Sequence, residues 1–187
     1  MVEEENRSNL DVLKENIREL CGNGKHSVHI NDTQAETWRI ASSICNQNSI
    51  HMLNYRVWSE TNKFDHFFRT YKNIVDNRQD KDDFCVDSSA VLSAYGLRDC
   101  RDIDFLHKKN IGYLSTDISC HNEEEKHYSE TRHEIIHNPS KHFYLFGVKF
   151  AGIEVVKKMK INRNEDKDKV DVRLICEIGS ESQQPKT

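Results

Sequence analysis

The sequence predicts an α/β (α+β) fold in which a mixed β-sheet is flanked by helices. Short apolar or alternating segments, typical of strands, are interleaved with segments whose apolar residues recur at helical spacing. The chain of 187 residues is 36% hydrophobic and 31% charged, which describes one globular core rather than two. We therefore expect a single domain over residues 1–179 with an N-terminal strand-helix-strand extension (1–80), and a disordered tail over residues 180–187.

The first 80 residues are predicted to hold three helices and two short strands. The helices are expected over residues 9–20, 33–46 and 62–77, and the strands over residues 26–31 and 49–54. Apolar residues at helical spacing identify the first and third helices. Thr33 and Glu36 form the capping box that opens the second helix. Because that helix lies between two alternating segments, this part of the chain favours an α/β architecture.

The rest of the chain is predicted to hold four strands and three helices. The strands are expected over residues 83–87, 102–107, 134–138 and 143–150, and the helices over residues 88–96, 152–160 and 167–178. Ser88 or Ser89 begins the first of these helices, which ends near Gly96. The polar run NEEEKH (122–127) is expected to be a solvated loop, and Pro139 separates the last two strands.

Composition excludes several classes of function. The formal net charge of −4 argues against strong nucleic-acid binding, which needs clustered Lys and Arg. No apolar run approaches the roughly 20 residues that span a bilayer, so we expect no membrane span. The acidic N-terminus has no apolar core of a secretory signal, which predicts a cytoplasmic protein. The six cysteines form no CxxC pair, which favours free thiols in a reducing compartment.

The segment HEIIH (133–137) matches the HExxH pattern of zinc-dependent hydrolases. In that pattern two histidines bind one zinc ion from one face of a helix, and the glutamate is the general base. Here the two central isoleucines favour a strand, and the Asn-Pro pair that follows would end a helix at the second histidine. In a strand, His133 and His137 would lie about 13 Å apart, too far for one zinc ion. A zinc-dependent hydrolase is therefore only the third interpretation.

A denser pattern lies in VDSSAVLSAYGLRDCRDIDFLH (86–107). A strand ends at Ser88 and Ser89, a short helix follows, and the chain returns into a second strand that starts with Asp102 and Asp104. Alternation places the two aspartates on one face of that strand. Two carboxylates on one face form a site for a hard divalent cation, and N–H groups at the helix start could bind a phosphate. The pattern therefore predicts a metal and phosphate site.

This arrangement resembles the polymerase-beta-like nucleotidyltransferase superfamily, in which a pair of small residues starts a helix before an Asp-x-Asp strand. With Gly96-Leu97-Arg98 ahead of the aspartates, it is most similar to the phosphocholine-transferase and fukutin-type branch. A Lys-Asp-x-x-Asp run, here Lys167 to Asp171, extends the resemblance over residues 83–176. Ser88 departs from the pattern, since the family usually has Gly there, and a side chain could crowd a phosphate.

The resemblance implies a nucleotidyltransferase-like fold and a metal-dependent transferase that moves a nucleotidyl or phosphoryl-linked group from a nucleotide or phosphorylated donor to a hydroxyl acceptor, with a glycan or surface polymer as one such acceptor. Asp102 and Asp104 would bind Mg²⁺ or Mn²⁺. The donor phosphates would be bound by the following residues: Ser88, Ser89, and Arg98 or Lys149.

A third carboxylate is expected to help activate the acceptor hydroxyl. Glu134 is the first candidate and Asp117 the second, whereas Asp168 and Asp171 are expected to cap or salt-bridge the last helix. A catalytically silent member of the fold, acting as a binding or scaffold module, is the alternative to the transferase.

Overall fold

The computed structural model describes residues 2–27, 31, 33–57 and 62–178. Within them the chain divides into two compact units, Met1–Ala41 and Ser42–Thr187. We describe each unit by itself and call them the N-terminal and C-terminal units. The division does not fall at residue 80, where the expected extension ends, because the helices of residues 47–76 belong to the C-terminal unit.

The N-terminal unit is helical in its described part. It contains α1 (Val2–Cys21), a short 3-10 helix (Gly24–His26) and most of α2 (Gln34–Ile44). The hydroxyl of Thr33 accepts a hydrogen bond from the Glu36 N–H at 3.1 Å, so the predicted cap opens α2. Of the strand expected over residues 26–31, the first residue lies in the 3-10 helix, and residues 28–30 lie outside the described residues.

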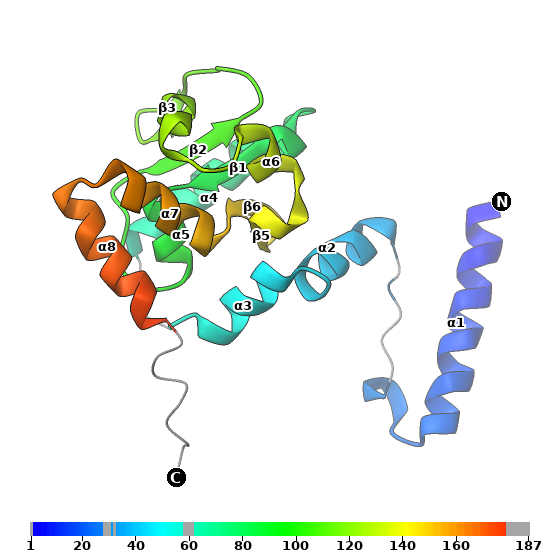
Figure 1. Ribbon diagram of the computed structural model, residues 1–187. Helices are drawn as coiled ribbons and strands as arrows, with labels where there is room; N and C mark the ends of the chain where they lie inside the picture. Colours follow the sequence, from blue (N-terminus) through cyan, green and yellow to red (C-terminus); the bar gives the residue numbers. More distant parts are fainter. Residues whose placement is uncertain (1, 28–30, 32, 58–61, 179–187) are drawn as a thin grey trace, which may run out of the picture. The chain divides into compact units, whose positions relative to one another are not determined.

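The C-terminal unit alternates helices and short strands (Figure 1). Its helices are α3 (Gln47–Tyr55), α4 (Asn62–Asp76), α5 (Ser89–Ala94), α6 (Arg132–His137), α7 (Ile153–Arg163) and α8 (Asp166–Glu177). Its strands are β1 (Phe84–Asp87), β2 (Ile103–His107), β3 (Tyr113–Ser115), β4 (Ile118–Cys120), β5 (His142–Leu145) and β6 (Val148–Ala151). Short 3-10 helices cover Lys81–Asp83, Asn122–His127 and Pro139–Lys141. No helix in the described part of the chain is long and apolar enough to cross a membrane.

The strands form one mixed sheet in the order β3-β4-β2-β1-β6-β5. The pairs β1/β2, β3/β4 and β5/β6 are antiparallel, while β1/β6 and β2/β4 are parallel. In the β1/β2 register, Asp87 lies opposite Asp104. The predicted class, an α/β (α+β) fold with a mixed sheet flanked by helices, is confirmed.

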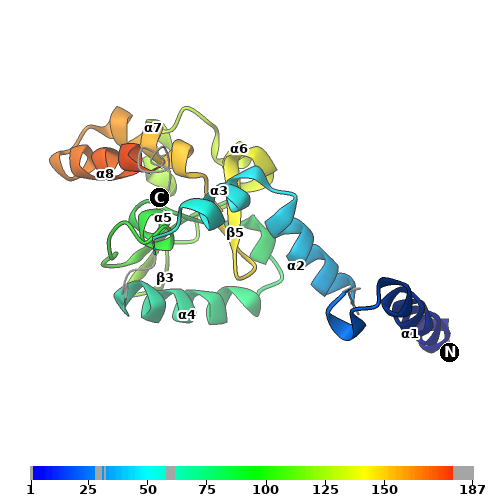
Figure 2. The same cartoon turned by 90° about the horizontal axis from the view of Figure 1, so that it is seen from below.

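The two faces of the sheet are covered by different helices. Figure 2 shows α4 on one side of the sheet and α6 and α7 on the other. Tyr71 of α4 packs on Phe84 and Phe105, at ring-centroid distances of 6.4 and 6.0 Å, and all three are buried. Because side chains alternate along a strand, Asp87 and Asp104 point to the opposite face, away from α4. These two carboxylates therefore lie on the face of the sheet that α6 and α7 cover.

The strand predicted over residues 49–54 is wrong, since these residues lie in α3. The side chain of Asn46 caps that helix by accepting a hydrogen bond from the Ser49 N–H at 2.9 Å. Ser49 and Met52, three residues apart, are both buried. In a segment this short, alternation and helical spacing predict nearly the same apolar positions. The cap by Asn46 makes this segment a helix rather than a strand.

The strand predicted for HEIIH is also wrong. Arg132–His137 form α6, and Thr131 and Glu134 make a capping box at its start. The Glu134 carboxylate accepts hydrogen bonds from the Thr131 N–H and hydroxyl at 2.9 and 2.8 Å. Asn138 leaves the helix with φ −94° and ψ 114° before Pro139. The proline therefore ends the helix after His137 but does not prevent it.

The other predicted elements of this unit agree with the structure within a few residues. The last predicted strand is a hairpin, β5 and β6, turned by Phe146 and Gly147 at positive φ. The expected loop at 122–127 is a 3-10 helix. Strands β3 and β4 were not predicted. The C-terminal tail, residues 180–187, lies outside the described residues.

Candidate functional site

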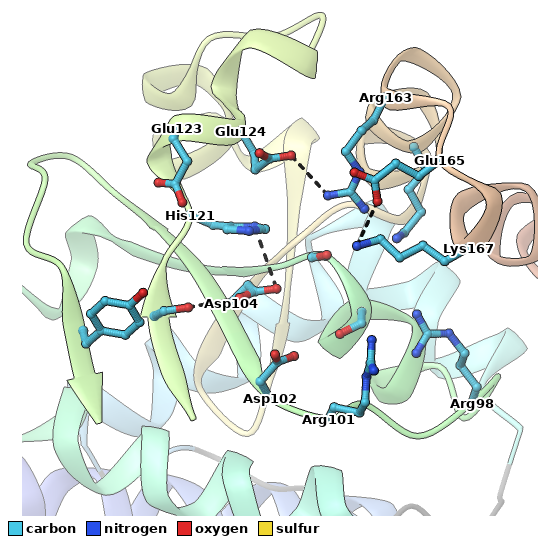
Figure 3. Close-up of a pocket in the computed structure, with 15 residues that line it drawn as sticks. Arg98, Arg101, Asp102, Asp104, His121, Glu123, Glu124, Arg163, Glu165 and Lys167 are labelled. Atoms are coloured by element: carbon cyan, nitrogen blue, oxygen red, sulfur yellow. Dashed lines mark hydrogen bonds and ion pairs between the residues drawn. The ribbon is translucent and has the colours of Figure 1, made fainter. Parts of the chain in front are cut away.

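A pocket of about 390 Å³ lies where β2 and β4 meet α5 and the junction of α7 and α8 (Figure 3). Its charged wall consists of Asp102, Asp104, Glu123, Glu124, Glu165, Arg98, Arg101, Lys160, Arg163 and Lys167. Ser88, Ser89, Tyr113, Ser119 and His121 complete the lining. Acidic and basic side chains are equal in number, so the pocket suits a ligand that carries both signs of charge, such as a metal-bound phosphate.

The acidic pair lies on one side of β2, as alternation predicts. Ile103 is fully buried, and the carboxylates of Asp102 and Asp104 both line the pocket (Figure 3). The Asp104 carboxylate accepts a hydrogen bond from the Ser119 hydroxyl at 3.2 Å and lies 3.8 Å from Nδ1 of His121. The side chain of Asp104 is only 14% exposed. The pair is therefore half embedded in the protein.

Burial, together with the negative charges of Asp102 and Asp87, raises the pKa of the Asp104 carboxyl to about 6, against the opposing effect of His121. A carboxylate in this position is poorly stabilised by its protein surroundings. A bound cation would supply the missing positive charge.

Asp87 is a carboxylate that the sequence analysis did not single out. It ends β1, opposite Asp104, and is fully buried. Neither of its oxygens makes a hydrogen bond of good geometry with a described residue. Burial and the charge of Asp87 raise the pKa of the neighbouring Tyr128 hydroxyl. Asp87 therefore adds negative charge beneath the pocket without lining it.

Ser88 connects β1 to α5 in a conformation that suits glycine. Its backbone has φ 57° and ψ −129°, and its side chain makes no capping hydrogen bond. An L-residue with positive φ is strained by about 1–3 kcal/mol. A glycine would adopt this positive φ without the strain that the Ser88 side chain introduces. Such strain is concentrated at functional sites in proteins.

Buried ion pairs hold much of the basic wall in place. The guanidinium of Arg98 donates two hydrogen bonds to Asp171, at 2.6 and 2.8 Å. The ammonium of Lys160, 1% exposed, lies 2.7 Å from Asp171 and 3.2 Å from Asp168. Asp168 also accepts from Arg163 at 2.8 Å and belongs to the capping box of α8. The expectation that Asp168 and Asp171 cap or salt-bridge the last helix is confirmed.

Two basic residues of the wall are more available to a ligand. Arg101 is exposed and has no ion pair with any residue that the structure describes. Lys167 is 58% exposed, and among the described residues it pairs only with Glu165, at 2.9 Å. Arg98, the predicted phosphate ligand, is instead occupied by Asp171.

The pocket brings together five of the seven predicted site residues: Ser88, Ser89, Arg98, Asp102 and Asp104. Glu134 is not among them, because its carboxylate caps α6. Lys149 is also elsewhere, donating from Nζ to the Asp82 carbonyl at 2.8 Å. Asp117, the second candidate for a third carboxylate, does not line the pocket either.

The structure places His121, Glu123 and Glu124 in the pocket, which the sequence analysis missed. They follow β4, which was not recognised, and the acidic run was interpreted as a solvated loop. Their proximity follows from the parallel pairing of β4 with β2, which sets His121 next to Asp104. A strand prediction for residues 118–120 would have been the signal that identified them.

The described residues contain no group of three or more His, Cys, Asp or Glu side chains already arranged around a common metal position. The candidate site is thus a pair of carboxylates, which is sufficient for Mg²⁺ when substrate phosphate and water supply the other ligands. No protein-family model, curated protein or solved structure matched the chain in our comparisons, so functional inference depends on the pocket itself.

Proposed function

We propose that the protein is a metal-dependent transferase of nucleotidyltransferase type, which moves a nucleotidyl or phosphoryl-linked group from a phosphorylated donor to a hydroxyl acceptor. The observation that carries the proposal is the pair Asp102 and Asp104 in a charged pocket, with the Asp104 pKa raised to about 6 by burial and neighbouring carboxylates. The arrangement favours a cation, and the residue types favour a hard one.

The donor set fits Mg²⁺. Asp102 and Asp104 would hold the ion, because both present carboxylate oxygens to the pocket and Mg²⁺ is commonly bound by one or two carboxylates together with phosphate oxygens. Bound there, the ion would neutralise phosphate charge and orient the donor. Mn²⁺ takes the same ligands and would serve in its place.

The surrounding residues supply the other functions of a transferase. Arg101 and Lys167 can bind phosphate oxygens, since the first has no competing ion pair in the described structure and the second has only an exposed one. His121, whose Nδ1 lies 3.8 Å from Asp104, would accept a proton from an acceptor hydroxyl. The turn at Ser88 would present the start of α5 to the donor phosphates. A glycan acceptor rests on the family resemblance alone.

The proposal is tested by ligand-dependent thermal stabilisation of the full chain. Mg²⁺ together with a nucleoside di- or triphosphate is expected to raise the melting temperature of the wild type, and Asp102→Ala/Asp104→Ala should abolish the shift. The matched control is Asp65→Ala/Asp76→Ala, which removes two carboxylates from α4, outside the pocket.

The alternatives give different results in the same assay. A scaffold module would show no nucleotide-dependent shift in any variant. If the pocket variant and the control respond equally to Mg²⁺ and nucleotide, Asp102 and Asp104 are not the metal ligands and the proposal fails.

A further inference from the structure

Helix α6 carries a second set of metal-ligating side chains, outside the pocket. His133 and His137 are four residues apart on this helix, and their ring centroids lie 4.7 Å apart. The separation of about 13 Å that a strand would impose therefore does not apply. Residues at i and i+4 share one helix face, so both imidazoles can bind the same ion. Neither histidine lines the pocket.

The segment before β1 supplies a third group. Oδ1 of Asp83 lies 3.6 Å from Nε2 of His137. Ligand atoms about 2.0–2.1 Å from a tetrahedral zinc ion are roughly 3.4 Å from each other, so this distance is close to that between two ligands of one ion. The side chains of Asp83 and His137 are 25% and 32% exposed, which leaves them accessible to solvent ions.

We propose that His133, His137 and Asp83 form a binding site for Zn²⁺ or a similar borderline-soft divalent cation. Two imidazole nitrogens and one carboxylate oxygen suit such an ion, whereas the all-oxygen pair in the pocket suits Mg²⁺. Because no three such groups of the described residues already enclose a metal position, binding requires a rotation of the His133 or Asp83 side chain. Water would take the remaining position.

The surroundings favour metal binding over hydrolysis. Glu134 occupies the sequence position of the general base in zinc hydrolases, but its carboxylate is held by Thr131 in the capping box. The ion would instead link α6 to the segment that leads into β1.

The test is a calorimetric Zn²⁺ titration of metal-free full-length protein. Exposed thiols also bind zinc, so the background carries Cys21→Ser, Cys45→Ser and Cys176→Ser. We expect one equivalent to bind, and affinity to fall by roughly 100-fold in His133→Ala/His137→Ala, since loss of even outer-shell support costs metal sites about 10–100-fold.

Two further variants complete the design. Asp83→Ala should weaken Zn²⁺ binding, whereas His66→Ala, which removes an exposed histidine from α4, should leave it unchanged. Circular dichroism without metal verifies that each variant is folded, and His137→Gln replaces any variant that is not. Equal Zn²⁺ affinity in the background protein and the double-histidine variant overturns the proposal. Asp102→Ala/Asp104→Ala should bind Zn²⁺ normally, so this site and the pocket are tested independently.

Discussion

Replacing Asp104 by Asn should stabilise the protein at neutral pH. The pKa of Asp104 is raised from 3.8 to about 6 by burial and by the charges of Asp102 and Asp87. The difference is about two pH units, and each unit corresponds to about 1.4 kcal/mol, so ionised Asp104 costs the folded state about 3 kcal/mol. Asn removes the charge and keeps an oxygen that can accept from the Ser119 hydroxyl.

The sign of the effect gives a pH window. The folded pKa lies above the unfolded pKa, so the folded state binds the proton more tightly. The wild type should lose stability as the pH rises from about 4 to about 6 and stay lower above that range. The advantage of the Asp104→Asn variant should therefore be about 3 kcal/mol above pH 7 and fall below about 1 kcal/mol near pH 4.

Urea unfolding of the wild type and the Asp104→Asn variant at both pH values measures the difference directly. Asp65→Asn is the control, because Asp65 is an exposed carboxylate in the first turn of α4, and its loss should at most lower the stability at neutral pH, by about 0.3–1 kcal/mol, opposite in sign to the effect expected for Asp104→Asn. A variant that is no more stable than the wild type above pH 7, or that gains the same amount at both pH values, would refute the reasoning. Mg²⁺ should narrow the gap at neutral pH, because it stabilises only the ionised wild-type site.

Four other substitutions test the structure in the same unfolding assay. Ser88→Gly should stabilise by about 1 kcal/mol, because relief of positive-φ strain exceeds the entropy cost of Gly; a loss of stability would contradict the strained turn. Asp171→Ala should cost about 3–5 kcal/mol by leaving the buried Lys160 ammonium short of a partner, and a loss under about 1 kcal/mol would argue against the ion-pair network. Thr131→Ala should lower the free energy of unfolding by about 1 kcal/mol, because it removes the side-chain cap of α6. If Glu134→Ala leaves the free energy of unfolding unchanged, the capping box does not form.

Local patterns predicted the centre of the sheet well. In β1, α5 and β2 the apolar segments, the small residues and the returning glycine all indicate the same structure, and each element appears within two residues of its expected bounds. The prediction failed in short segments, where the apolar positions fit both the alternation of a strand and the spacing of a helix. Residues 49–54 and 134–138 are both short apolar segments, and in each case a side-chain cap, by Asn46 or by Thr131, makes the helix.

The candidate site divides in the same way. Asp102 and Asp104 were predictable because they lie on either side of Ile103, the first residue of β2, where alternation fixes their common face. Glu134 was assigned because residues 134–138 were expected to form a strand, but Glu134 lies in α6. No local pattern placed Lys149 near the aspartates, and it lies in β6, outside the pocket. His121 reaches Asp104 only through the β2/β4 pairing, a long-range contact that no local pattern encodes.

The pocket is where this chain departs most from the rules that favour stability. Ser88 holds a positive φ that a glycine would adopt without strain, and Asp104 keeps an ionisable group beside two other carboxylates. Asp87 adds a fully buried carboxylate directly across the strand pair. Each feature costs stability, and each could be removed by one substitution. Because structural needs alone would not bring three such features to one strand pair, their coincidence favours a site for a charged ligand over a solvated strand end.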